Sequence, residues 1–220
     1  MRIDFSPVFQ HQIKLSDFAQ QYTLQDLINA THASLDHLRT ILEPLTDAHM
    51  TFDSVDPQAD DPYAKEGEEK IGWSLAHLVV HVTASAEEAA AIASILARGV
   101  PFGREPRLRY ETEWRTITTK AQAVQRLEES RRMRLGYLAT FPDQPHWDNL
   151  QVISDHAKEL WGDLDPKTRF LLGLYHEWQH YDQFIEVRNQ AVAAYPIDTE
   201  ATVETPAVQK STPAQAGHSQ

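Results

Sequence analysis

The stretch from residue 169 to residue 187, RFLLGLYHEWQHYDQFIEV, constrains the fold most, because its apolar residues recur at helical spacing. Asp165 followed by Pro166 is a typical helix start, an N-cap side chain before a proline at the first helical position. The spacing predicts one continuous helix whose apolar face includes Leu172 and Phe184. In a protein, such a helix is stabilised mainly by packing this face against other elements.

Two histidines, His176 and His180, lie on this same face one turn apart. At this spacing their imidazoles project from one side of a helix about 6 Å apart and can share one metal ion. A chain with 11 histidines also contains such pairs by chance, so two satisfied core histidines are the alternative interpretation. Partly buried imidazoles need partners for their ring nitrogens, and a shared cation supplies one for each.

The absence of cysteine from the 220 residues excludes disulfides, thiolate metal ligands and a cysteine nucleophile. Any metal must therefore be held by His, Asp or Glu. A formal net charge of −12 argues against nucleic acid and anionic membranes as main partners, because both are bound by clustered cations. The N-terminus lacks an apolar signal-peptide core, and no stretch approaches ~18 uninterrupted apolar residues, so we expect a cytoplasmic protein.

Three further segments combine helix-start signals with helical apolar spacing. The first begins at Thr23, whose Thr-x-x-Asp box includes Asp26, and ends near Pro44. The second covers about residues 73–98, and the third begins at Thr119. These segments predict an all-α protein, an up-and-down four-helix bundle with long connecting loops. In such bundles metal ligands project into the core from facing helices.

The remaining segments are irregular in composition. Residues 1–22 are expected to form an extended lead-in, and residues 46–72 a long surface loop of the kind that often borders a site. A short helix is expected at about 154–161. The composition of residues 195–220 indicates a disordered low-complexity tail, so the predicted helical domain covers residues 1–194.

Basic residues are concentrated between residues 98 and 134, which hold ten of the 20 in the chain. Such a run is usually a solvated arm. If it folds over the site instead, it could steer a small anionic substrate, and Arg107 and Arg109 are then the candidate substrate-binding residues.

A third imidazole is available on the second helix, where His77 and His81 flank the apolar stripe four residues apart. Either one could reach a site formed by His176 and His180 if the two helices are neighbours. Periodicity does not distinguish the two, and each could also be an exposed histidine at the helix edge.

The chain shares a short motif with a known family. Trp73 is followed eight residues later by His81, and the C-terminal helix contains His176-x-x-x-His180-x-x-Gln183. This pattern resembles the DinB-like (YfiT-like) family of metalloenzymes. Members of that family include thiol transferases and isomerases that use a small-molecule thiol such as mycothiol or bacillithiol.

The resemblance covers about residues 23–192 in its order of elements. It implies a three-histidine site for a divalent metal, which is zinc, nickel or iron in different members. It carries the role of metal ligand onto His81, His176 and His180, and it prefers His81 over His77 by its offset from the tryptophan.

Taken together, these features predict a metal-dependent enzyme acting on a small molecule. Three neutral ligands leave the cation its full charge, so a bound water reaches a pKa of about 7 and a bound thiol is deprotonated. The expected chemistry is activation of water or a low-molecular-weight thiol, of the thiol S-transferase, isomerase or hydrolase type. Glu177 and Gln183 are the candidate catalytic residues. Gln183 is expected to anchor the site from one turn beyond His180, and Glu177 or Asp182 to orient the ligand imidazoles. A homodimer is plausible for a small bundle.

Three alternatives stay open. The fold could serve a non-catalytic metal- or ligand-binding stress-response protein, or hold a purely structural metal with a fourth protein ligand. The sequence His176-Glu177-x-x-His180 also fits the HExxH signature of zinc proteases, whose glutamate is the general base. Such proteases need a third ligand downstream and a substrate-binding strand, and no strand-like alternation precedes this helix.

Overall fold

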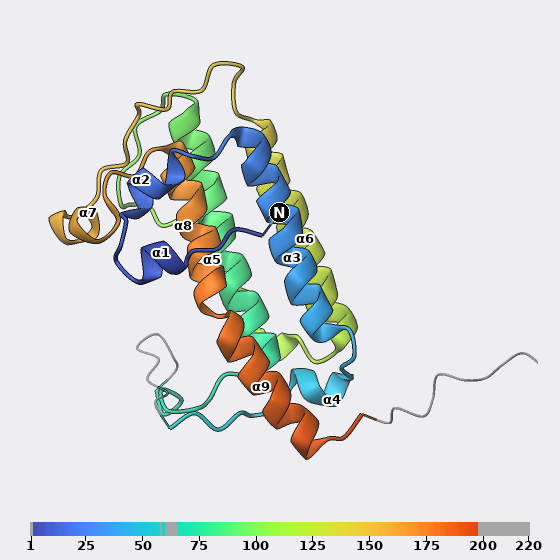
Figure 1. Ribbon diagram of the computed structural model, residues 1–220. Helices are drawn as coiled ribbons and strands as arrows, with labels where there is room; N and C mark the ends of the chain where they lie inside the picture. The colour runs from blue at the N-terminus through green and yellow to red at the C-terminus, as the bar shows by residue number, and fades with distance from the viewer. Residues whose placement is uncertain (1, 58, 60–65, 198–220) are drawn as a thin grey trace, which may run out of the picture.

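The computed structural model describes residues 2–57, 59 and 66–197. Within this part of the chain every regular element is a helix, so the predicted all-α class is confirmed. The long helices lie side by side in a bundle (Figure 1). They are α3 (Leu24–Leu42), α5 (Leu75–Ala97), α6 (Lys120–Ala139), α8 (Pro166–Gln179) and α9 (Tyr181–Ala194).

Short helices connect or flank these long ones. They are α1 (Ser6–Phe9), α2 (Leu15–Ala19), α4 (Asp47–Met50), the 3₁₀ turn η1 (Trp114–Thr116) and α7 (Asp155–Trp161). The last of these is the short helix expected from the sequence.

The helix starts follow the predicted capping signals. The Thr23 hydroxyl accepts from the backbone amide of Asp26 at 3.2 Å, and the Asp26 carboxylate accepts from the amide of Thr23 at 2.9 Å. Thr119 and Gln122 form the same reciprocal box at the start of α6. Asp165 accepts an amide of the first turn of α8 at 2.7 Å. These side chains satisfy amides that a helix N-terminus leaves without an intrahelical partner.

The central helix of the bundle is α5, which packs against α6, α8 and α9 and is buried on almost all sides. By length and composition alone it could cross a membrane. However, 83% of its most apolar window is buried inside the protein. A helix that is hydrophobic all round suits the core of a bundle, and α5 fills that place here.

Helices α5 and α8 approach each other closely at Gly173. A Cβ atom added there would lie 2.6 Å from the Cβ of Ala89 and 2.9 Å from the Cα of Ala86, too close for either contact. The distance between two helices depends on the side chains at their contact, and here glycine faces alanines. Gly173 precedes His176 by one turn, so the same contact brings the histidines of the two helices together.

The N-terminal segment differs from the predicted extended lead-in. Residues 2–22 contain two short helices, and Phe5, Leu15 and Phe18 are buried. The Phe5 ring packs against Phe18 and Tyr175, with ring centroids 5.6 and 5.5 Å apart. Helices α1 and α2 are too short to show a periodic spacing of apolar residues in the sequence. The burial of these residues therefore becomes visible only when the segment packs on α8.

The helix predicted to run through His176 and His180 is interrupted at His180. The backbone of His180 (φ −88°, ψ −4°) ends α8, and its amide bonds to the carbonyl of Glu177, three residues back, at 3.1 Å. Helix α9 then continues from Tyr181 with a change of direction (Figure 1). Apolar spacing does not reveal such a break, because the same face stays buried on both sides of it.

The predicted tail falls mostly on residues 198–220, which lie outside the described residues. Where residues 195–197 are described, they pack on the end of the bundle. The carbonyl oxygen of Tyr195 lies 2.8 Å from Nε2 of His49, and Ile197 packs against the core.

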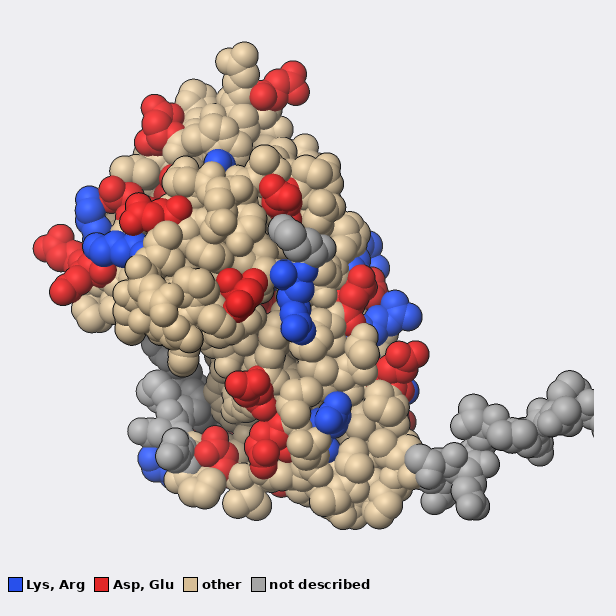
Figure 2. Space-filling model, in the orientation of Figure 1, with Lys and Arg blue, Asp and Glu red and all other residues tan. Residues whose placement is uncertain are grey.

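Acidic and basic side chains are interspersed over the face shown in Figure 2, and no continuous basic surface is visible on that face. The expectation that nucleic acid is not a main partner stays a prediction.

Replacing Phe5 with alanine should lower the free energy of unfolding by about 3–5 kcal/mol, because it empties a packed ring site in the core. Urea denaturation followed by circular dichroism measures this. Phe9→Ala is the matched control, since the Phe9 side chain is 55% exposed and its loss should change stability by less than about 1 kcal/mol. Equal losses in the two variants would contradict a buried role for Phe5.

Candidate metal centre

Three imidazoles meet between α5 and the junction of α8 with α9. Nε2 of His81 lies 3.2 Å from Nε2 of His176, and Nε2 of His180 lies 3.3 Å from that same atom. One ligand atom from each residue can be chosen so that all lie within 4.8 Å of one another. A tetrahedral zinc ion with Zn–N bonds of about 2.0–2.1 Å holds its ligand nitrogens about 3.3 Å apart. The three side chains therefore fit a shared divalent cation.

The orientation of His180 is set by a neighbour on α9. Nδ1 of His180 lies 2.7 Å from the amide oxygen of Gln183, which can only accept. The ring proton therefore belongs on Nδ1, and the lone pair of Nε2 points to the other imidazoles. Gln183 thus lies where the sequence motif predicts a residue that supports the site.

Burial keeps His176 and His180 neutral. Burial, followed by repulsion from His180 and His81, lowers the pKa of His176 to about 3. Burial likewise lowers the pKa of His180 to about 4, although its hydrogen bond to Gln183 acts in the opposite direction. Nδ1 of His176 is buried without a hydrogen-bond partner, so its contacts are made through Nε2. Because a metal binds the neutral imidazole, these surroundings suit ligation.

Glu177 takes a different place from the one expected. Its side chain is fully buried and accepts from Nη2 of Arg134 at 2.6 Å and from the Ser34 hydroxyl. The Ser34 hydroxyl in turn lies 2.8 Å from that of Tyr181. Glu177 therefore ties α8 to α3 and α6, and its hydrogen bonds go to Arg134 and Ser34 rather than to a ligand imidazole. The same contacts argue against the HExxH general-base role, because this carboxylate is already neutralised by a buried arginine.

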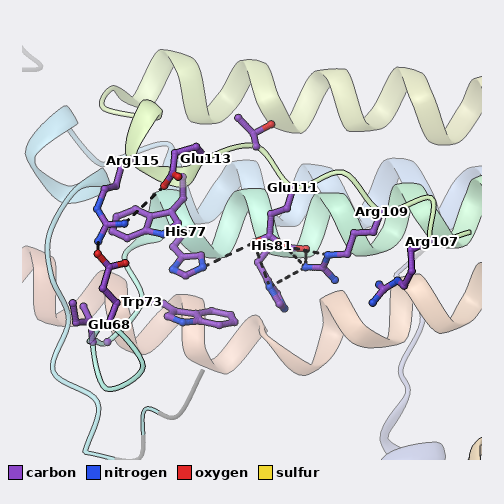
Figure 3. Close-up of a pocket in the computed structure, with 13 residues that line it drawn as sticks. Glu68, Trp73, His77, His81, Arg107, Arg109, Glu111, Glu113 and Arg115 are labelled. Carbon is purple, nitrogen blue, oxygen red and sulfur yellow. Dashed lines mark hydrogen bonds and ion pairs between the residues drawn. The ribbon is translucent and has the colours of Figure 1, made fainter. Parts of the chain in front are cut away.

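His77 and His81 have different surroundings in the structure, and only His81 belongs to the three-histidine group found among the described residues. The His77 ring is stacked on the indole of Trp73, with ring centroids 4.4 Å apart (Figure 3). It is also stacked on the indole of Trp114, with ring centroids 5.0 Å apart. Trp73 also stacks on His180, with centroids 5.8 Å apart. The three-histidine group thus contains His81, as the resemblance prefers, and Trp73 packs beside it.

A cavity of about 410 Å³ opens beside His81 (Figure 3). Its walls are α5, the end of the loop that precedes α5, and the segment 107–115. The loop after residue 46 therefore borders this cavity, as expected. The charged side chains lining it balance in sign, being Glu68, Glu111 and Glu113 with Arg107, Arg109 and Arg115.

The two candidate substrate-binding arginines, Arg107 and Arg109, both line this cavity, but each already bonds a carboxylate. Arg107 donates twice to Glu88, at 3.1 and 2.8 Å. Arg109 donates from Nε to Glu111 at 3.1 Å and from Nη1 to the Ser85 hydroxyl. The positive field that they offer an anionic substrate is therefore small.

Glu111 is a site residue that the helical periods did not reveal. Its Oε1 lies 3.7 Å from Nδ1 of His81. Burial by itself raises the pKa of Glu111, but the neighbouring His81 and Arg109 side chains outweigh it and lower the pKa to about 2. One sign of this is present in the sequence, because charged and apolar residues alternate from Arg107 to Glu111. Arg109 and Glu111 face the cavity, whereas Leu108 and Tyr110 line a separate groove.

A helical bundle that brings imidazoles from facing helices to one point has the arrangement typical of metal-binding bundles. This chain belongs to the DinB superfamily, whose family model matches residues 30–184, more than half of the chain. The match confirms the resemblance carried by the tryptophan and histidine motif. Neither the curated proteins nor the solved structures contain a match to this chain.

The structural role of Glu177 predicts that Glu177→Gln destabilises the fold without removing the metal. Breaking a buried ion pair from one side costs about 3–5 kcal/mol, because it leaves the other charge uncompensated. Urea denaturation measures the loss, and elemental analysis measures the metal. The double variant Arg134→Met/Glu177→Leu should recover much of the stability. Full stability together with lost metal would instead place Glu177 in the metal site.

The lowered histidine pKa values predict acid sensitivity of the metal-free protein. His176 and His180 have an ordinary pKa of 6.5 when unfolded but about 3 and 4 when folded, so below pH 6.5 the unfolded state binds more protons. The contribution of the two neutral histidines to the free energy of unfolding is complete above pH 6.5. It is lost as the pH falls toward their pKa values in the folded protein. Denaturation between pH 7.5 and 4.5 measures the slope. In the double variant His176→Asn/His180→Asn, the free energy of unfolding should depend less steeply on pH. An unchanged slope would show that these two histidines do not cause the acid sensitivity.

Proposed function

We propose that this chain is a metal-dependent enzyme in which His81, His176 and His180 hold one divalent cation, zinc, nickel or iron. The cation would activate water or a small thiol for attack on an electrophile. The observation that carries the proposal is the convergence of three Nε2 atoms beside a cavity. Within the described residues this group has three members, as in catalytic zinc sites, which keep a coordination position for water or substrate.

When bound, a divalent cation lowers the pKa of a coordinated water to about 7 and deprotonates a coordinated thiol. The side chains of the protein support this chemistry. Gln183 fixes the ring of His180, and the stacked rings of Trp73, His77 and Trp114 form an aromatic wall of the cavity.

The cavity supports a small-molecule substrate, because its volume of about 410 Å³ lies within the range of small-molecule sites, about 300–1,000 Å³. The chain has no cysteine, so any thiol used in the reaction has to arrive as a second substrate. These features favour a thiol S-transferase, isomerase or hydrolase. Arg107 and Arg109 line the cavity and would contact the substrate there. Because both already bond carboxylates, they would attract an anionic substrate only weakly.

Protein purified without chelator or nickel resin should contain about one divalent ion per chain by elemental analysis. His81→Ala, His176→Ala and His180→Ala should each reduce this content strongly, because each removes one of three ligands. His156→Asn is the matched control, since His156 is exposed on α7 and lies outside the ligand group, and its metal content should be unchanged.

The same preparations test turnover. Glutathione, bacillithiol or mycothiol with a generic electrophile should give conjugation that chelation abolishes and added metal restores. Metal binding without turnover of any thiol or hydrolysable substrate would favour the non-catalytic binding protein. Metal content that is absent from the wild type, or unaffected by all three alanine variants, would refute the proposed function.

A further inference from the structure

Two groups compete for one nitrogen of His81. Nη2 of Arg109 lies 3.0 Å from Nδ1 of His81, and Oε1 of Glu111 lies 3.7 Å from the same atom. Both side chains come from the connection between α5 and α6, which passes over α5 at this point (Figure 3). The two neighbours are also bonded to each other, from Nε of Arg109 to Glu111 at 3.1 Å.

These two contacts require opposite forms of the His81 ring. A guanidinium can only donate, so Nδ1 must accept the hydrogen bond from Arg109, and the neutral ring then carries its proton on Nε2. Nε2 is the atom that faces His176. In this tautomer His81 has no lone pair to offer a cation. An ionised carboxylate can only accept, so a hydrogen bond to Glu111 would put the proton on Nδ1 and free Nε2.

His180 shows the arrangement that a ligand needs. Its Nδ1 lies 2.7 Å from the amide oxygen of Gln183, an acceptor, and its Nε2 lone pair is therefore available. Metal-binding histidines generally donate their second ring N–H to a carboxylate, carbonyl or water. Around Nδ1 of His81, Glu111 is the side chain that can accept such a bond.

We propose that Glu111 is the positioning residue that makes His81 a metal ligand, and that Arg109 competes with it for Nδ1. On metal binding, the ring proton of His81 moves from Nε2 to Nδ1, with no net gain or loss of protons. Glu111 accepts the new N–H bond. Arg109 leaves Nδ1 but keeps its bonds to Glu111 and to the Ser85 hydroxyl. This inference rests on the proposed metal site.

The first test is metal affinity of the full chain, measured by competition between the stripped protein and a chromophoric chelator for Zn²⁺ and Co²⁺. Glu111→Leu should weaken binding by about 10–100-fold, the usual effect of removing such a partner, because leucine has no atom that can accept the Nδ1 hydrogen bond. Arg109→Met should bind as tightly as the wild type or more tightly. Glu105→Gln is the matched control, an exposed carboxylate on the same connection, and should leave the affinity unchanged.

The second test reads the tautomer directly from ¹⁵N shifts of the His81 ring. The proton should lie on Nε2 in the metal-free wild type and on Nδ1 after Zn²⁺ is added. Glu111→Leu with the affinity of Glu105→Gln would overturn the proposal. So would weakening in Arg109→Met equal to that in Glu111→Leu, because the pair would then only support the connection. A wild type that binds no metal would refute the proposed function itself, a separate outcome.

Discussion

The site depends on how closely α5 and α8 approach each other. Gly173 lies against Ala86 and Ala89, where even one added methyl group would collide with α5. One turn further along α8, His176 reaches Nε2 of His81 at 3.2 Å. A bulkier contact would hold the helices further apart and separate the imidazoles by a similar distance. The convergence of the three imidazoles is therefore a consequence of helix packing as much as of the histidines.

The rotation of α8 is fixed on its other side by the buried pair of Glu177 and Arg134. Because Glu177 is adjacent to His176 on the helix, the bond that holds the carboxylate toward α3 and α6 also directs the imidazole toward α5. A buried ion pair is costly to desolvate, so its contribution here is better described as orientation than as net stability. Glu177, the glutamate of the HExxH-like sequence, thus acts on the site indirectly, by fixing the orientation of α8.

Two carboxylates illustrate the difference between neighbours in sequence and neighbours in space. Glu177 follows a ligand histidine directly and yet lies away from the site, bonded to Arg134. Glu111 lies far from every ligand in sequence, and its Oε1 is 3.7 Å from Nδ1 of His81. Together with Arg109, it leaves the charges along this wall of the cavity nearly balanced.

The sequence by itself determined the all-helical class, the helix starts at Thr23, Thr119 and Asp165, and the candidate ligands, because capping and helical spacing are local properties of the chain. The tertiary structure brings His81, which the family resemblance had preferred over His77, next to His176. Only the tertiary structure showed that the helix is interrupted at His180 and that Glu111 reaches the site. Those features depend on the distance and rotation between helices that are far apart in sequence, which the period of a single helix does not contain.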